Sequence, residues 1–532
     1  MPEQLSADIV VIGSGVCGSL SAHRLATQGA SVLILEAGPR LTRDQLVLNY
    51  RNGAFKGHWM DPYPFFPWAP SPSFYPKANG YLVQAGPYPY PAEYVRIVGG
   101  TTWHWAAHCW RVLPNDMKIK TLYGVGRDWP ITYDELEPFY YEAEVKMGVS
   151  GGPGTGSPRS QPYPMEPMPE PWAMRRIRER LAPGGYEVIT NPQGRTSRPY
   201  DGRPACCGNN NCQPICPIDA QYTGGIAATA AEKAGAKLIP NAVVYRIEPD
   251  PQGRIAAVHY YDPNKNSTRV TGKTFILAAN GIESPKLLLV SASDKYPNGL
   301  ANSSDTVGRN LLDHPSSSLT FDADEDLWLG RGQQSPSSIQ KFRDGPFRSE
   351  HAAFRLDFTN ISQVRTAAED LIKEGVYGPQ LAQQIRYRAA RQQNVKDVLE
   401  VLPHPENRVT LSSQKDALGI PKPEVHYSMD DYVHKGMEVA REEYGKIAKL
   451  LGGTNLRYTP KGEYGNNQHI CGTMAMGNDP KDSVVDRFGR THDHPNLYIA
   501  STGVMPTVAT VNSTLTAVAL AMRTAQHIHE TI

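Results

Sequence analysis

The 532-residue sequence lacks any long hydrophobic run. Its most apolar stretch, TLTAVALAMRTAQHI near the C-terminus, is interrupted by threonine and arginine, whereas a membrane-spanning helix needs about 20 apolar residues in succession. The N-terminal segment MPEQLSADIVVIG has acidic residues where a secretory signal peptide has basic ones, and its apolar run is shorter than the roughly 7–15 residues that such a signal needs. We therefore expect neither a spanning helix nor a signal peptide in this chain.

An excess of charge is also missing. The 54 Lys and Arg residues and the 53 Asp and Glu residues leave a formal net charge of +1, and no block of one sign stands out. Nucleic-acid binding depends on a basic surface, so we expect no nucleic-acid partner. At this length the chain predicts two domains, each with a sizeable core.

Cysteine is scarce, with seven residues, yet four of them fall within eleven positions, at Cys206, Cys207, Cys212 and Cys216. The surrounding ACCGNNNCQPICP is rich in turn formers, which allow a loop to fold around an inorganic core. The x5 and x3 spacings differ from the C-x2-C pairs of a zinc ribbon, which also needs a fourth ligand. The pattern favours three thiolate ligands of an iron–sulfur cluster, with disulfides as the alternative, and either of the adjacent cysteines could be the first ligand.

The chain begins with a βαβ pattern. Residues 8–13 predict a strand, residues 16–28 a helix that ends at Gly29, and residues 31–35 a second strand. This order places the turn after the first strand at the N-terminus of a helix.

Three glycines lie in that turn, in the order Gly13-Ser-Gly15-Val-Cys-Gly18, and Glu36 follows the second strand. In such a fingerprint Gly13 permits the tight turn, Gly15 lets a pyrophosphate approach the helix N-terminus, and Gly18 allows close packing of helix on strand. Glu36 can accept hydrogen bonds from ribose hydroxyls. The segment predicts a dinucleotide site but does not distinguish FAD from NAD.

The rest of the chain continues the α/β pattern and then changes character. The segment TFILAANGIESPKLLLVS predicts a buried strand that turns into a helix, whereas residues 316–461 mix strand-like runs with amphipathic helices. We predict an α/β fold with a discontinuous Rossmann-like domain over residues 1–315 and 462–532, which includes the cysteine loop at 200–222. Residues 316–461 are predicted to form an α+β substrate lobe on an antiparallel sheet.

Three segments, VGGTTWHW, NGIESPKLLL and the C-terminal VVDRFGRTHDHPNLYIASTGVMPTVATVNSTLTAVALA, resemble the glucose-methanol-choline (GMC) flavoprotein oxidoreductases. The resemblance covers most of the chain and implies an FAD cofactor, a catalytic His469 in NNQHICG and a catalytic Asn512 in PTVATVNSTLT. A neutral imidazole suits removal of a hydroxyl proton while the flavin takes a hydride. Asn512 would hold the same oxygen in position and also contact the cofactor.

The same resemblance implies further contacts to the cofactor. Gly100 belongs to the flavin-binding loop, and His104 stands where several family members attach FAD covalently. A neutral His104 that only hydrogen-bonds near the flavin is the alternative, and His108 is a rival for the covalent link. Val244 corresponds to the family's adenine-contacting strand.

Two further segments, YGVGRDWPITYDELEPFYYEAEVKMGV and RPYDGRPACCGNNNCQPICPIDAQYTG, resemble the large subunits of bacterial membrane-associated sugar, polyol and sugar-acid dehydrogenases. This implies a 3Fe-4S cluster on Cys206, Cys212 and Cys216. It also implies a small subunit that carries a twin-arginine export signal, a multihaem cytochrome c subunit as electron acceptor, and a place at the periplasmic face of the inner membrane.

One position departs from that subfamily, because Asp219 stands where glycine is expected near the last cysteine. The expected function is an FAD-dependent dehydrogenase of a sugar, polyol or sugar acid, with a gluconate-type substrate favoured. The alternatives are an oxidase of the same family that uses oxygen, and a non-catalytic flavin and iron–sulfur redox module.

Overall fold

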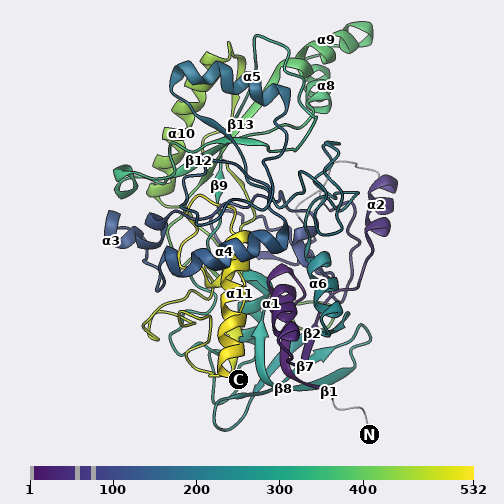
Figure 1. The fold of residues 1–532 in the computed structure, drawn as a ribbon, viewed down its shortest axis with the longest axis vertical. Coiled ribbons are helices and arrows are strands. Elements are labelled where there is room, and N and C mark those ends of the chain that lie inside the picture. The colour runs from purple at the N-terminus through teal and green to yellow at the C-terminus, as the bar shows by residue number, and fades with distance from the viewer. Residues whose placement is uncertain (1–4, 54–59, 74–78) are drawn as a thin grey trace.

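The computed structural model describes residues 5–53, 60–73 and 79–532, and Figure 1 shows two regions stacked along its long axis. The lower region contains β1, α1, β8 and α11, so segments from both ends of the chain lie together there. The upper region contains α5, α8, α9 and α10 around strands β12 and β13.

The lower region is built on a seven-stranded sheet in the order β5-β2-β1-β8-β7-β6, with β18 beside β8. Strand β1 runs parallel to β2 and β8, whereas β6, β7 and β8 are antiparallel neighbours. The strands are β1 (Leu5–Ile12), β2 (Val32–Leu35), β5 (Lys237–Ile239), β6 (Val243–Pro249), β7 (Ile255–Tyr261), β8 (Ser267–Leu277) and β18 (Leu497–Ile499). The predicted opening βαβ unit is confirmed.

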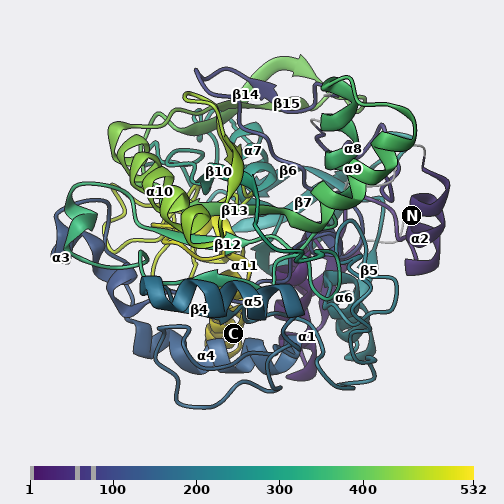
Figure 2. The same ribbon diagram turned by 90° about the horizontal axis from the view of Figure 1, so that it is seen from above.

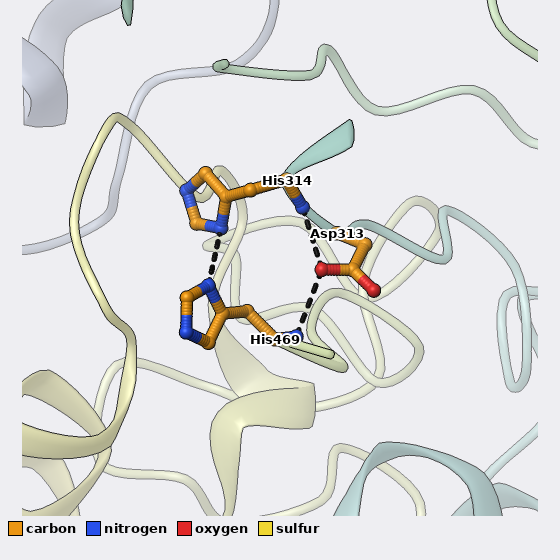
Figure 3. A group of neighbouring side chains, drawn as sticks. All are labelled: Asp313, His314 and His469. Carbon is orange, nitrogen blue, oxygen red and sulfur yellow. Dashed lines mark hydrogen bonds between the residues drawn. The ribbon is translucent and has the colours of Figure 1, made fainter. Parts of the chain in front are cut away.

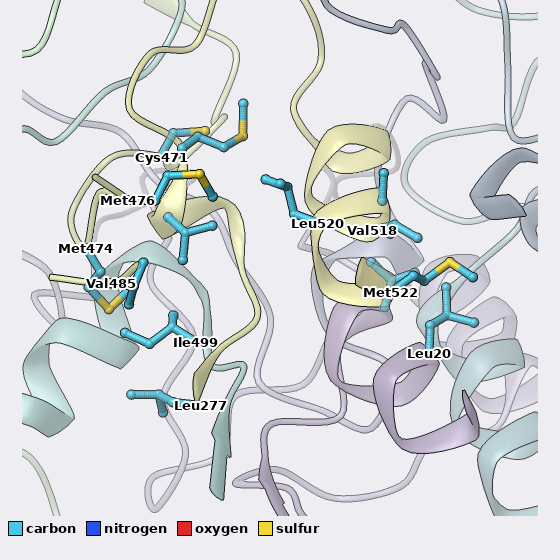
Figure 4. Close-up of a cluster of buried hydrophobic side chains, with 14 of the residues drawn as sticks. Leu20, Leu277, Cys471, Met474, Met476, Val485, Ile499, Val518, Leu520 and Met522 are labelled. Atoms are coloured by element: carbon cyan, nitrogen blue, oxygen red, sulfur yellow. The ribbon is translucent and has the colours of Figure 1, made fainter. Parts of the chain in front are cut away.

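Helices cover this sheet. They are α1 (Val16–Thr27), α6 (Gly224–Lys233), α7 (Asn280–Val290) and α11 (Thr514–Thr531). Figure 4 shows Leu20 of α1 beside Met522 of α11, and both side chains are almost fully buried. Because α11 comes from the end of the chain and packs on the first helix, the Rossmann-like region is discontinuous in sequence.

The upper region is an antiparallel six-stranded sheet in the order β16-β10-β13-β12-β11-β4. Its strands are β4 (Val188–Thr190), β10 (Ser318–Asp322), β11 (Ser337–Ile339), β12 (Phe354–Phe358), β13 (Gln392–Leu399) and β16 (Thr454–Tyr458). The helices of this region are α5 (Trp172–Leu181), α8 (Val364–Lys373), α9 (Gly378–Arg391) and α10 (Asp431–Leu450). Seen from above, α10, α5 and the α8–α9 hairpin lie on different sides of β12 and β13 (Figure 2).

The antiparallel sheet of the predicted substrate lobe is thus confirmed. Helix α5 and strand β4 precede residue 316, yet their apolar side chains Ile177 and Val188 belong to the same core as Phe354 and Leu399. The lobe therefore includes residues outside the predicted range of 316–461, while the division of the chain at that range stays a prediction.

Smaller elements join the two regions. They are α2 (Arg43–Asn52), α3 (Ile119–Tyr123), α4 (Tyr133–Met147), a three-stranded sheet of β14 (Arg408–Lys415), β15 (Pro421–His426) and β3 (Val83–Gln84), and a two-stranded pair of β9 (Pro315–Ser316) and β17 (Gly465–Asn466). The β9–β17 pair brings the segments around residues 313 and 469 together. No helix within the described ranges is both long and apolar enough to cross a membrane.

Candidate active site

The turn between β1 and α1 leaves room for a ligand at the helix N-terminus. Gly13 has φ +103°, and a Cβ there would lie 2.6 Å from the carbonyl oxygen of Ala278. A Cβ on Gly18 would lie 2.2 Å from the oxygen of Gly13, so close packing requires both glycines. Among the described residues, a Cβ on Gly15 would meet no atom within 4 Å, and no side chain caps the start of α1. The open N–H end of this helix suits a pyrophosphate.

Glu36 closes the same turn from the end of β2. Its Oε2 accepts hydrogen bonds from the backbone N (2.9 Å) and the hydroxyl (2.6 Å) of Ser14, and its Oε1 accepts from the N–H of Gly38 (3.0 Å). Burial raises the pKa of Glu36. The carboxyl group is therefore fixed in place before any ligand arrives.

A cavity runs along this turn and contains most of the predicted nucleotide contacts. Its lining includes Gly13, Gly15, Glu36, Gly100 and Val244. Gly100 has φ +61°, and a Cβ there would lie 3.2 Å from the Cα of Gly15, which brings the two glycine loops close together.

Two more cavities continue the first one and together form a single cleft. The second shares Gly15 and Thr101 with the first and reaches His469. The third shares Thr101 and His469 with the second, and it also contains His104 and Asn512. The cleft therefore joins a nucleotide end at the helix N-terminus to a reactive end at His469, which fits the elongated shape of FAD.

His469 is held by two residues from the segment before β9, as Figure 3 shows. One oxygen of Asp313, Oδ1, accepts the backbone N–H groups of His314 (2.6 Å) and His469 (2.8 Å). The Nδ1 atoms of the two imidazoles lie 2.8 Å apart. Their ligand atoms are close enough for a metal site, but these hydrogen bonds already use the facing imidazole nitrogens and the carboxylate oxygen.

The hydrogen bonds assign the tautomers of both rings. The Nε2 of His314 lies 3.1 Å from the carbonyl oxygen of Ala509, which can only accept, so this nitrogen carries the proton. In the neutral ring Nδ1 of His314 is then an acceptor, and Nδ1 of His469 donates to it. The Nε2 of His469 therefore carries a lone pair and no proton. Burial lowers the pKa of His314 to about 3 and lowers the pKa of His469 well below its ordinary value, so both rings are neutral.

Asn512 meets that lone pair. Its Nδ2 lies 3.0 Å from Nε2 of His469, and its Oδ1 accepts from a guanidinium nitrogen of Arg355 (3.0 Å). The fork of Arg355 is held by both oxygens of Asp357, at 2.7 and 2.9 Å. The amide of Asn512 is thus oriented with its NH₂ group toward the imidazole. A hydroxyl that entered between the two side chains would replace this hydrogen bond, because it could donate to Nε2 of His469 and accept from the NH₂ group of Asn512.

The two other predicted histidines line the same end of the cleft. His104 is 2% exposed, and its ring lies 5.4 Å from that of Tyr63. Nε2 of His108 lies 2.9 Å from the carbonyl oxygen of Ser335, and burial lowers the pKa of His108 to about 4. Because a carbonyl oxygen only accepts, Nε2 of His108 carries a proton and donates it to Ser335.

The cysteine loop lies beside the reactive end of the cleft, where Gln213 lines the cavity that contains His469. Cys212 and Cys216 are buried, Cys206 is partly buried and Cys207 is exposed, and none of them forms a disulfide. Burial raises the pKa of Cys206, and the neighbouring thiols of Cys212 and Cys216 raise it further. Cys212 and Cys216 thus lie near enough to Cys206 to affect it, while the fourth thiol, Cys207, is turned to the surface, and the ligand set stays a prediction.

Two glutamines tie this loop to the turn at residues 100–105. Gln213 donates to the carbonyl oxygen of His104 (2.9 Å), and Gln221 donates to that of Trp105 (2.8 Å). Gln213 also lines the cavity that contains His469. The predicted cluster loop and the predicted active site therefore share a wall.

Sequence reasoning missed several residues of this site. Asp313 and His314 lie about 155 positions from His469 in the chain, and no motif in the sequence connects them. Lys396 of β13 also lines the reactive end, where its Nζ donates to Asn467 (3.1 Å). An adjacent Asp-His pair before a proline was the only visible signal, and by itself it indicates no partner.

Comparison with known proteins agrees with the geometry. Models described as GMC oxidoreductase match residues 209–316 and 403–521, and one described as an NAD(P)-binding Rossmann-like domain matches residues 11–58. The chain is 50% identical to the fructose dehydrogenase large subunit of Gluconobacter japonicus, with 99% of this chain and 98% of that protein covered. It is 22% identical to the gluconate 2-dehydrogenase flavoprotein of Pantoea cypripedii, with 99% and 94% covered.

Among solved structures, pyridoxine 4-oxidase from Mesorbium loti matches with a TM-score of 0.67 at 20% identity, with 98% of this chain and 99% of that chain covered. This likeness shows the fold. Together, the fold and the cleft define a flavin-dependent oxidoreductase. The chain belongs to the GMC oxidoreductase family, and the predicted family and enzyme class are confirmed.

Proposed function

We propose that this protein is a dehydrogenase that oxidises a sugar CH–OH group at the His469 end of the cleft. The observation that carries the proposal is the hydrogen-bonded chain that leaves Nε2 of His469 unprotonated beside the amide of Asn512. His469 accepts the hydroxyl proton, and Asn512 holds the oxygen. FAD, when bound, accepts the hydride from the carbinol carbon. Its nucleotide part would be held by Gly13, Gly15 and Glu36.

We further propose a neutral sugar of the fructose type as the substrate, in place of the gluconate type that the sequence favoured. The greater identity to the fructose dehydrogenase large subunit supports this choice. A carboxylate is commonly bound by the fork of an arginine, but the fork of Arg355 is already held by Asp357. Among the described residues that line this cavity Lys396 is the only lysine or arginine, and amides such as Gln213 and Gln334 are suited to hydroxyl groups.

For electron release we propose a 3Fe-4S cluster on Cys206, Cys212 and Cys216, which supplies a one-electron relay to a multihaem cytochrome c subunit. The relative's description as a large subunit supports a multi-subunit assembly. A small subunit with a twin-arginine signal and a place at the periplasmic face of the inner membrane complete this proposal. If FAD is attached covalently, His104 is the proposed site, because Nε2 of His108 is hydrogen-bonded to the carbonyl oxygen of Ser335.

A panel of fructose, sorbitol, glucose and gluconate tests the proposal on purified holoenzyme in air, with an artificial dye as acceptor. We expect dye reduction with a neutral sugar, little hydrogen peroxide, and an iron–sulfur signal in the electron paramagnetic resonance spectrum. Peroxide formation without an iron signal would favour the oxidase alternative. A His469→Ala variant that turns over sugar at the full rate would favour the non-catalytic redox module.

A further inference from the structure

Arg195 is a buried cation beside the cysteine loop. It is 2% exposed, and its two terminal nitrogens donate to the side-chain oxygens of Gln193 and Gln221. Within the described part of the chain, no carboxylate forms an ion pair with it. A buried charge that is held only by neutral amides is costly unless another charge offsets it.

Other buried arginines of this protein have carboxylate partners. Arg111 pairs with Glu144 at 2.9 Å, and Arg348 pairs with Asp116 at 2.9 Å. Arg195 differs from these two arginines, although it shares the lack of a described carboxylate partner with Arg203 and Arg343.

The surroundings of Arg195 connect it to the cysteines. The backbone N–H of Cys206 donates to the carbonyl oxygen of Thr196, the next residue after Arg195 (2.9 Å). Gln221, which accepts from the guanidinium, has its amide nitrogen 3.5 Å from the carbonyl oxygen of Cys212.

Two other cations lie around the loop. Arg43 donates to the carbonyl oxygen of Cys216 and forms an ion pair with Asp219, the position that departs from the subfamily pattern. Arg203 lies over the ring of Tyr222, at 5.3 Å from its centroid. The charge of Asp219 is thus offset by Arg43, whereas Arg195, like Arg203, forms no ion pair with a described carboxylate.

We propose that Arg195 is the internal counter-cation of the iron–sulfur cluster and that its charge raises the reduction potential of the cluster. The proposal rests on the cluster proposed above. A cluster with three thiolate ligands is anionic, and each electron that enters makes it one unit more negative. A fixed cation in a poorly screened interior stabilises the reduced form more than the oxidised form, which favours acceptance of electrons from the flavin.

The test is a redox titration of purified holoenzyme followed by electron paramagnetic resonance, with iron content measured on each sample. Arg195→Gln removes the charge, whereas Arg195→Lys keeps it. At the wild-type midpoint potential we expect the ratio of reduced to oxidised cluster to fall about tenfold in Arg195→Gln, which is about 59 mV for one electron. In Arg195→Lys the ratio should stay within about twofold of wild type, a shift of less than about 20 mV.

Arg343 offers a matched control. It is also buried, and it is also without an ion pair to any described carboxylate, but it donates to Thr510 and to the carbonyl oxygens of Arg111 and Thr155, away from the cysteines. Arg343→Gln should leave the cluster potential at its wild-type value. An equal shift in Arg343→Gln and Arg195→Gln would overturn the proposal, as would a full iron content with an unchanged potential in Arg195→Gln.

If Arg195→Gln loses its iron, Gln193→Glu decides the question. This change keeps the guanidinium in place but pairs it with a carboxylate, so the potential should again fall, and an unchanged potential would overturn the proposal. If the wild-type protein contained no iron, the proposal of a cluster would itself be wrong, and the variants would not need to be compared.

Discussion

The reactive end of the cleft at His469 and the neighbouring cysteine loop, here called the cysteine end, are held together in opposite ways. At the His469 end the contacts join residues far apart in sequence, with about 155 positions between His314 and His469 and 43 between His469 and Asn512. At the cysteine end the proposed ligands lie within one short loop. The first end is closed by hydrogen bonds between protein groups, whereas the second contains three thiols and a buried guanidinium that forms no ion pair with a described carboxylate.

This difference indicates which part of the site the protein completes by itself. The tautomer of His469 is set by a backbone carbonyl and a neighbouring imidazole, so it is fixed even when no cofactor is bound. The cysteine end reaches charge balance only with an anionic ligand. Changes at the first end should therefore affect the chemical step, and changes at the second should affect the ligand and the release of electrons.

The largest effect is expected for His469→Ala. Loss of a positioned base typically costs about 10²–10⁴-fold in rate, so kcat for sugar oxidation should fall by that amount. The visible absorbance of bound flavin should stay unchanged, because the nucleotide end of the cleft is intact. A fall of less than about fivefold would show that the base lies elsewhere.

At the cysteine end, Cys206→Ser and Cys207→Ser form a matched pair of adjacent substitutions. Cys206→Ser should lose iron and cytochrome-linked turnover while flavin reduction by sugar persists, because only a proposed ligand is removed. Cys207→Ser should keep both, since its side chain is exposed. The reverse outcome, measured by iron analysis and cytochrome reduction, would make Cys207 the ligand.

A smaller effect is expected for His314, which acts through His469 as a positioning residue. His314→Leu removes the acceptor for the Nδ1 proton, and we expect kcat to fall about 10–100-fold with little change in KM. His314→Gln should recover much of the rate, because an amide oxygen can accept that proton while its NH₂ group donates to Ala509. Equal losses in both variants would contradict the assigned tautomers.

The pH profile gives a second check on this end. Burial lowers the pKa of His469, so the neutral base persists below the ordinary value of 6.5. In wild type the acid limb of kcat/KM should therefore lie below pH 6.5 and activity should be lost only as the pH falls through the lowered pKa. An acid limb above pH 6.5 would argue against a buried neutral His469.

The smallest effect is expected for Lys396→Met at the reactive end. Loss of one charged hydrogen bond to a substrate hydroxyl costs about 1.5 kcal/mol, which corresponds to a rise in KM of about tenfold for a neutral sugar. We expect that hydroxyl to bind where Lys396 now donates a hydrogen bond to Asn467. If gluconate oxidation is strong in wild type and is selectively lost in this variant, the substrate is a sugar acid after all.

Local patterns in the sequence were sufficient for the elements that depend on near neighbours. The βαβ unit and its three glycines were predicted because strand, turn and helix signals lie within 30 residues, and close packing at Gly13 and Gly18 explains why glycine is required. The catalytic assignment of His469 and Asn512 rested on resemblance to a family. It stays a prediction, although the structure brings the two side chains within 3.0 Å.

The remaining features needed the fold. Strand β4 pairs with the sheet of the substrate lobe although it precedes that lobe in sequence. The environment of Arg195 depends on Gln221, which lies 26 residues later in the chain and accepts a hydrogen bond from its guanidinium. The preference for a sugar acid had no physical basis in the sequence, since pocket residues such as Lys396 come from a strand whose neighbours were unknown.

The sequence by itself determined the dinucleotide turn, the order of the Rossmann-like and substrate-lobe segments along the chain, and a loop with four closely spaced cysteines, because each follows from residues close together in the chain. Only the tertiary structure decided which nitrogen of His469 is unprotonated and that Arg195 lies beside the cysteine loop without an ion pair to a described carboxylate. Both depend on hydrogen bonds between distant segments, and such contacts leave no periodic or spacing signal in a single sequence.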